Sequence, residues 1–271
     1  MTSTKTRCVV AIPAYKVHLN DLEVISIRQC LSVLKAHDIR LVCPENLDIS
    51  VYEQLFAEYD RVLETIRFEP HFFQSINGYN SLLLNKAFYE CFEQWEYMLL
   101  YQPDAFVFRD EVDYWCSQGY DYIGAPWRIV RTTQIDPINS GNGGFSLRKV
   151  ESMIDALTNR RFLLTLEGLK YLYEERGPYR KPYLLFRGMF GFQNSVKSII
   201  EKDLANEDKF FAMQRYRRKS PFKVPNSDVA MYFSFEQDPS YLFKQTGGKL
   251  PFGCHAWERY EYDSFWSKHI R

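Results

Sequence analysis

The sequence predicts an α/β fold with a mostly parallel central sheet. Short apolar segments recur along the first 104 residues, and they alternate with segments that carry apolar residues at helical spacing. No internal repeat or low-complexity linker interrupts this pattern. Strands separated by helices are joined by right-handed crossovers, which makes neighbouring strands parallel. We therefore expect one domain over residues 1–271, with its ligand site beyond the carboxyl ends of the strands.

The expected elements follow in order along the chain. Predicted strands cover residues 8–12, 40–43, 62–68, 97–101, 120–125 and 143–147. Predicted helices cover residues 19–36, 51–59, 78–92, 107–118, 149–157 and 192–202. Pro13 and Pro44 end the first two strands, and residues 160–187, rich in Tyr, Arg and Leu, receive no assignment.

Charge and composition exclude some classes of partner. Lys plus Arg and Asp plus Glu both number 34, so the whole chain offers no general attraction for nucleic acid or an acidic membrane. The six cysteines occur singly, which favours a reducing cytosol. No stretch approaches the roughly 18 apolar residues that cross a bilayer. We expect a cytoplasmic protein with at most peripheral membrane contact. Its 17% aromatic content suits stacking on sugars and bases as well as core packing.

An acidic residue follows the apolar segment at residues 97–101. The stretch ends in Tyr-Gln-Pro-Asp104. Mg²⁺ and Mn²⁺ favour oxygen ligands and leave positions open for the phosphates of a substrate, a need that Asp104 suits. The same carboxylate could instead cap a helix that begins near Phe106. Both interpretations stay open from the residues alone.

Three glycines surround an asparagine in Ser140-Gly-Asn-Gly-Gly-Phe-Ser-Leu-Arg148. Glycine lets the backbone approach a ligand closely and leaves amide groups free to bind it. A tight turn also accounts for the glycines, although it gives no reason for Asn142 and Arg148. Taken alone, this motif favours a turn.

Two acids, Glu207 and Asp208, open a predicted helix. A carboxylate there could deprotonate an acceptor hydroxyl as a general base. The helix dipole also favours acids in a first turn, and this is the simpler interpretation of the pair alone. The basic run at residues 215–219 is either a solvated face or a contact for a diphosphate.

One histidine stands out among the five of the chain. His255 lies in Pro251-Phe-Gly-Cys-His-Ala-Trp257, between a glycine and a tryptophan. A neutral imidazole can bind a borderline ion such as Mn²⁺ beside carboxylates. A single histidine is more often an ordinary surface or core residue. No other histidine lies in a comparable setting, so His255 is the candidate ligand.

Read in order, these motifs resemble a domain-of-unknown-function family of bacterial and fungal proteins that are similar to GT-A glycosyltransferases. The matching stretches span nearly the whole chain: Val10-Ala-Ile-Pro-Ala-Tyr15, Tyr79-Asn-Ser-Leu-Leu83, Tyr101-Gln-Pro-Asp-Ala-Phe-Val-Phe108, Tyr120-Asp-Tyr-Ile-Gly-Ala-Pro-Trp127, Gly141-Asn-Gly-Gly-Phe-Ser-Leu-Arg148, Glu207-Asp208 and Phe252-Gly-Cys-His-Ala-Trp257. The resemblance implies a single GT-A (nucleotide-diphospho-sugar transferase) domain with a mixed, mostly parallel sheet flanked by helices. Residues 1–104 would form its nucleotide-binding half, and residues 105–271 its sugar and acceptor half.

The resemblance also implies a nucleotide site in the first half. Pro13 and Tyr15 would lie near the base of the nucleoside, and Tyr79 and Asn80 would line the same side. In the second half, the segment around Asn142, Gly143 and Gly144 would shape the sugar and acceptor subsites.

The metal and the base are assigned by the same resemblance. Asp104 falls at the last acid of an Asp-x-Asp metal motif, in which Gln102 replaces the first acid and offers only a neutral oxygen. His255 matches a late metal ligand, so we expect it to meet Asp104 around one Mn²⁺ or Mg²⁺ ion. Asp208 or Glu207 would be the catalytic base.

The function implied is transfer of a sugar from a nucleotide-diphosphate donor, a UDP-sugar, to a hydroxyl of a glycan or lipid-linked acceptor, with inversion. Such a reaction belongs to polysaccharide biosynthesis. Two alternatives remain. The chain could be a catalytically inactive nucleotide- or carbohydrate-binding protein of the same fold. The second alternative is a sugar nucleotidyltransferase. That class opens with a glycine-rich loop after the first strand, so the absence of glycine from Ala11-Ile-Pro-Ala-Tyr15 disfavours it.

Overall fold

The computed structural model describes residues 6–128, 134–158, 165–168, 206–217 and 221–270. The helix predicted at residues 192–202 lies outside these ranges. Within them, no helix is long and apolar enough to cross a membrane.

The main sheet joins six strands of the described residues in the order β3-β2-β1-β4-β9-β6. Their bounds are β1 Thr6–Pro13, β2 Asp38–Pro44, β3 Glu64–Phe68, β4 Trp95–Tyr101, β6 Tyr122–Ile123 and β9 Phe145–Lys149. The first four in sequence are parallel, whereas β9 runs antiparallel to both β4 and β6. The prediction of a mixed, mostly parallel sheet in an α/β fold is confirmed.

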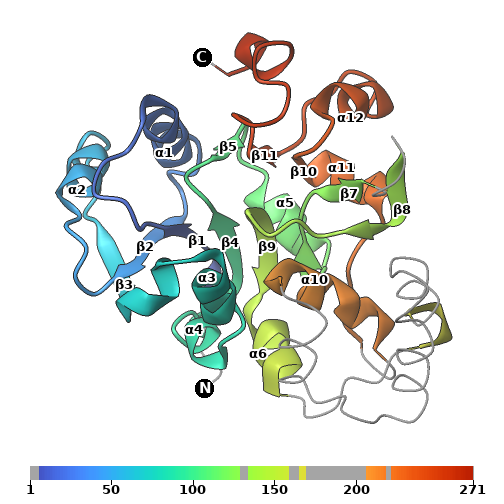
Figure 1. The fold of residues 1–271 in the computed structure, drawn as a ribbon, viewed down its shortest axis with the longest axis horizontal. Helices are drawn as coiled ribbons and strands as arrows, with labels where there is room; N and C mark the ends of the chain where they lie inside the picture. Colours follow the sequence, from blue (N-terminus) through green and yellow to red (C-terminus); the bar gives the residue numbers. More distant parts are fainter. Residues whose placement is uncertain (1–5, 129–133, 159–164, 169–205, 218–220, 271) are drawn as a thin grey trace.

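Helices cover both faces of this sheet (Figure 1). One face packs against α1 Asp21–Val33, α2 Ser50–Ala57, α5 Val112–Ser117 and α11 Ser227–Phe233. The other packs against α3 Ile76–Leu83, α4 Lys86–Glu90, α6 Val150–Thr158 and α10 Glu207–Ala212. Successive side chains of a strand point to opposite faces, so Val9 and Val10 enter different core clusters. Burial on both faces explains the continuous apolar runs that predicted these strands.

A smaller sheet extends from the carboxyl end of β4. It contains β5 Ala105–Val107, β10 Ser234–Phe235 and β11 Gly253–His255, in the order β10-β11-β5. Figure 1 shows these strands beside α12 Pro239–Gln245 and the C-terminal segment, which includes the 3₁₀ turn Trp266–Lys268. Aromatic side chains from both segments pack against this sheet. A separate hairpin joins β7 Pro126–Arg128 to β8 Ile135–Ser140.

Three predicted elements differ most from the structure. The helix expected at 78–92 is divided into α3 and α4. The division lies at Asn85, whose Oδ1 accepts the N–H of Ala87 and caps α4. The helix expected at 107–118 begins only at Val112, and the strand expected at 120–125 keeps only two residues. Since residues 105–107 form strand β5, the interpretation of Asp104 as a helix cap is wrong.

Leu99 tests the central packing of the sheet. It lies in β4 and is fully buried between β1 and β9. Replacing it with Ala should lower the free energy of unfolding by about 2–5 kcal/mol, since the change removes buried methyl groups and leaves a cavity. Urea denaturation measures this. Leu166→Ala is the matched control, because Leu166 is 76% exposed and its truncation should cost under about 0.5 kcal/mol. Equal costs would contradict the packing described.

Candidate functional site

The register of the small sheet brings three ionisable side chains together. The parallel pairing of β10 with β11 carries Glu236 alongside His255, since the residues one position earlier are partners. The antiparallel pairing of β11 with β5 sets His255 opposite Ala105, the residue after Asp104. Backbone pairing thus places an imidazole between two carboxylates at the carboxyl end of β4.

The imidazole of His255 contacts polar atoms on both of its edges. Its Nε2 lies 3.0 Å from Oε1 of Gln102 and 3.3 Å from Oδ1 of Asp104. Its Nδ1 lies 3.4 Å from Oε1 of Glu236. The side chain of His255 is 12% exposed, that of Asp104 is 22% exposed and that of Glu236 is 8% exposed. The two residues expected to meet, Asp104 and His255, are therefore in contact and reachable from solvent.

These contacts set the charges of the group. Burial disfavours the charged imidazole, but the neighbouring Asp104 and Glu236 outweigh it and raise the pKa of His255 to about 10. Burial would raise the pKa of Asp104, yet its contact with His255 keeps that pKa below its ordinary value. At neutral pH, His255 is a cation and Asp104 an anion.

Gly144 lies directly under the imidazole of His255. A Cβ at this position would approach Nε2 of His255 to 2.0 Å, so any other residue would displace the ring. Its carbonyl also accepts the backbone N–H of Gln102 at 2.9 Å. The side chain of Asn142 turns back to accept the N–H of Gly144 at 3.1 Å. The glycine-rich segment is thus both a turn and a wall of the candidate site.

A buried ion pair lies next to this wall. Arg148 is fully buried, and it donates to Oε1 of Glu207 at 3.0 Å and to the hydroxyl of Tyr89 at 2.9 Å. A Cβ on Gly143 would lie 2.4 Å from Oε1 of Glu207. Because Gly143 and Gly144 are adjacent, Glu207 and His255 flank the same dipeptide. Asn80 ties the group to α3, since its Oδ1 accepts the N–H of Glu207 at 2.9 Å.

Asp208 is the second acid of the pair that opens α10. Its Oδ1 accepts the N–H of Lys209 at 2.6 Å, while its neighbour Glu207 is engaged with Arg148. Burial, followed by the negative charges of Glu207 and Glu236, raises the pKa of Asp208 to about 7. A carboxyl that titrates near neutrality is suited to proton transfer.

The remaining predicted residues surround this group at different depths. Pro13 is buried at the end of β1, whereas Tyr15 is 51% exposed. Burial raises the pKa of Tyr15, and the charge of Asp104 acts in the same direction. The hydroxyl of Tyr79 accepts a hydrogen bond from Nε2 of Gln102 at 3.2 Å.

The basic run at 215–219 makes contacts within the protein where it is described. Arg215 donates to Oδ1 of Asn226, and Arg217 donates to Oε1 of Gln214. Residues 218 and 219 lie outside the described ranges. The interpretation of this run as a diphosphate contact stays a prediction.

The donor atoms of the group fit a divalent cation. Adjacent ligands of an octahedral Mn²⁺ or Mg²⁺ lie about 3 Å apart, because each bond is about 2.1 Å long. Nε2 of His255 has two oxygens at 3.0 and 3.3 Å, from Gln102 and Asp104. Over the described residues no group of three or more His, Cys, Asp or Glu side chains converges on one point. Here the third donor would be the amide oxygen of Gln102.

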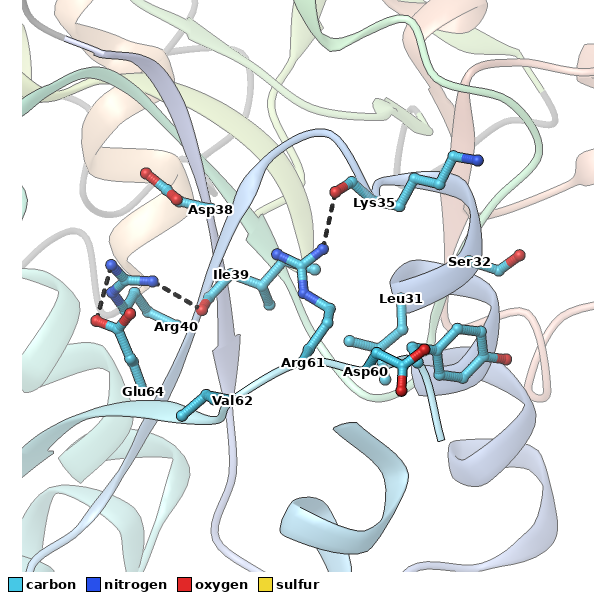
Figure 2. Close-up of a pocket in the computed structure, with 11 residues that line it drawn as sticks. Leu31, Ser32, Lys35, Asp38, Ile39, Arg40, Asp60, Arg61, Val62 and Glu64 are labelled. Atoms are coloured by element: carbon cyan, nitrogen blue, oxygen red, sulfur yellow. Dashed lines mark hydrogen bonds and ion pairs between the residues drawn. The ribbon is translucent and has the colours of Figure 1, made fainter. Parts of the chain in front are cut away.

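A hollow with a volume of about 600 Å³ lies at the opposite, amino ends of β2 and β3 (Figure 2). Several of its charged side chains bind neighbouring groups of the protein. Arg40 pairs with Glu64 at 2.9 Å, and Arg61 donates to the carbonyl of Lys35 at 2.9 Å. This hollow lies apart from the group around His255.

Sequence reasoning did not identify Glu236. It follows a strand of only two residues, and nothing in the surrounding Ser-Phe-Glu-Gln-Asp marks it as distinctive. Its buried Oε2 has no hydrogen-bond partner among the described residues, and the same is true of Oε2 of Glu207. Only the pairing of β10 with β11 could have pointed to it.

Comparisons with known proteins identify a family and a fold. A model of the family described as "Protein of unknown function (DUF5672)" matches residues 62–255. No curated protein matches the sequence. The galactosyltransferase LgtC, solved in complex with donor and acceptor sugar analogs, is 10% identical with a TM-score of 0.50, over 91% of this chain and 86% of that one. Mouse xyloside xylosyltransferase 1 is 13% identical with a TM-score of 0.50, over 92% and 97%.

A longer glycosyltransferase is also similar. The apo form of GlyE from Streptococcus pneumoniae is 12% identical with a TM-score of 0.46, over 93% of this chain and 54% of its own. The present chain therefore spans about half the length of GlyE. At such identities the likeness to LgtC and the mouse enzyme shows the fold alone, which is the GT-A fold of glycosyltransferases.

Asp208 should make stability depend on pH. Its pKa is about 7 in the folded chain and near 3.8 unfolded, so the folded state binds more protons between these values. The free energy of unfolding should therefore fall as pH rises from 4 to 7, by at most about 1.4 kcal/mol per pH unit. Urea denaturation at several pH values measures this dependence. The free energy of unfolding should fall with pH more steeply in the wild type than in Asp208→Asn.

Asp228 provides the control, because it too lies in a first helical turn and accepts the N–H of the next residue, but it is exposed. Asp228→Asn should leave the slope intact. An unchanged slope in Asp208→Asn would show that this carboxyl titrates normally.

Proposed function

The chain belongs to the family DUF5672 and has the GT-A fold, and from these premises we propose that it is a glycosyltransferase. Its donor is a nucleotide-diphosphate sugar, a UDP-sugar, and its acceptor is a hydroxyl of a glycan or lipid-linked glycan. One observation carries the proposal. Nε2 of His255 lies within 3.3 Å of side-chain oxygens of both Gln102 and Asp104. This contact is at the carboxyl end of β4, the end of the strands where α/β sheets bind ligands.

The proposed divalent cation, Mn²⁺ or Mg²⁺, would be held by Asp104 and His255, with the amide oxygen of Gln102 beside them. When bound, it supplies positive charge where the leaving diphosphate becomes more negative. His255 must lose its proton to serve as a ligand, so metal binding should strengthen as pH rises.

The donor is proposed to lie across the first half of the sheet. Tyr15 follows the carboxyl end of β1 and offers an exposed ring, suited to stacking on a nucleoside base. Pro13 fixes the backbone just before it, and Tyr79 holds the amide of Gln102 through its hydroxyl. Gly143 and Gly144 let the backbone of the proposed sugar subsite pack against Glu207 and His255, because a side chain at either position would collide with them.

Asp208 is the proposed base, in preference to Glu207. Glu207 is buried and its Oε1 is bound by Arg148, which favours a structural role. Asp208 titrates near neutrality, so its carboxylate can take the proton of an acceptor hydroxyl as that oxygen attacks the anomeric carbon. Attack from the face opposite to the leaving diphosphate gives an inverted product. A product that keeps the donor's anomeric configuration, read by NMR, would rule out this mechanism.

Asp104→Asn tests the ion-binding half of the proposal. It removes one anionic oxygen beside His255, and kcat/KM for the donor should fall at least about 100-fold with Mn²⁺ present. Turnover is followed as release of UDP from a set of UDP-sugars. Asp113→Asn is the control, because that carboxylate is 72% exposed and far along the chain from His255. A folded Asp104→Asn chain with full activity would remove Asp104 from the mechanism.

Asp208→Asn tests the base. The kcat should fall by about 10²–10⁴, which is the usual contribution of a positioned base. In the wild type, kcat should rise with pH through about 7 as Asp208 loses its proton, and the variant should lack that rise. Steady-state rates between pH 5 and 9 measure both effects, with Asp228→Asn as the matched control. A wild-type rise that persists in the variant would assign the base elsewhere.

An inactive binding protein of the same fold is distinguished in the same assays. Such a protein would gain thermal stability with a UDP-sugar and Mn²⁺, since a ligand that binds only the folded state raises its melting temperature. It would release no UDP under any of the conditions above.

A further inference from the structure

Glu236 has an environment that the proposed mechanism leaves unexplained. Its side chain is 8% exposed, and its Oε2 has no hydrogen-bond partner among the described residues. A buried carboxylate without full partners is costly, so its retention needs a compensating contact. The nearest described cation is the imidazole of His255, whose Nδ1 is 3.4 Å from Oε1.

The backbone fixes this contact. Glu236 and His255 follow paired residues in β10 and β11, two parallel strands held in the middle of an aromatic cluster. In neighbouring parallel strands, side chains at the same register lie on the same face. Gly144 packs against the Nε2 edge of the ring, since a Cβ built on it would lie 2.0 Å from Nε2. The ring therefore has one edge for Glu236 and one for Gln102 and Asp104.

We propose that Glu236 is a positioning residue, which accepts the Nδ1–H of His255 and so commits Nε2 to the cation between Gln102 and Asp104. The proposal rests on the assignment of Asp104 and His255 as the ion site. A neutral imidazole carries only one N–H, and the hydrogen bond of one nitrogen decides which nitrogen is free to bind metal. The contact at 3.4 Å is an ion pair that is longer than a formed hydrogen bond, and Nδ1 of His255 has no hydrogen-bond partner among the described residues.

A carboxylate in this position also increases the basicity of the imidazole. Loss of such an outer partner lowers metal affinity by about 10–100-fold in other metal sites. Glu236 does not itself lie among the donors, because Nε2 faces away from it and toward Gln102 and Asp104. Its effect should therefore appear in the affinity for the ion before any sugar or acceptor is added.

The test is Mn²⁺ binding to the full chain without donor, measured as loss of the free-ion EPR signal at pH 8. Glu236→Ala should weaken Mn²⁺ binding by about 10–100-fold. Glu236→Gln should fall between the wild type and Glu236→Ala, because its amide oxygen can accept the same hydrogen bond without the charge. Glu96→Ala and Glu96→Gln are the matched controls, since Glu96 is exposed on β4, and both should bind as the wild type does.

The outcomes separate this inference from the proposed function. A purely structural Glu236 would lower the melting temperature of the variants and leave Mn²⁺ affinity unchanged, which would overturn the inference. If Glu236→Ala does not fold, Glu236→Gln decides alone, and wild-type affinity in that variant would also overturn it. A wild type without saturable Mn²⁺ binding would overturn the ion site and this inference together. Wild-type Mn²⁺ binding without UDP release would instead contradict only the transferase proposal.

Discussion

A charged imidazole in a nearly closed space is the constraint around which this end of the molecule is organised. Burying a cation is costly unless opposite charges and hydrogen bonds surround it. Asp104 and Glu236 supply two carboxylates, and Gln102 supplies a neutral oxygen. His255 lies in the three-stranded sheet, Glu236 and Asp104 adjoin its strands, and Gly144 gives the ring its space. Removing either carboxylate would leave the charge of His255 less well compensated.

A second buried pair supports the first through the glycine-rich turn. Arg148 and Glu207 lie on the far side of Gly143, and Asn80 joins them to α3. Asp208 follows directly, and its burial, followed by the negative charge of Glu207, raises its pKa to about 7. The proposed base is thus the next residue after an ion pair that packs against the glycine-rich turn. The fold that carries this arrangement is shared with solved glycosyltransferases.

The parallel half of the fold could be predicted from the sequence because its strands are buried on both faces and read as continuous apolar runs. Boundaries governed by single side chains were not predictable, as at Asn85, where one cap divides a helix. Ordered motifs brought Asp104 and His255 into one hypothesis, and the structure places their atoms 3.3 Å apart. Glu236 was not predicted, because strands β10 and β11 are only two and three residues long. Strands this short show no hydrophobic periodicity in the sequence.

The site draws its parts from segments that lie far apart in the described chain. Asp104 and Gln102 follow the fourth strand, whereas His255 enters on a strand that pairs with β5 only once residues near 255 are present. A chain emerging from the ribosome can thus complete its parallel strands well before Asp104 and His255 can meet. Their contact forms only when the last strand has docked. A chain that stopped short of β11 would keep much of its core and lack the proposed ion site.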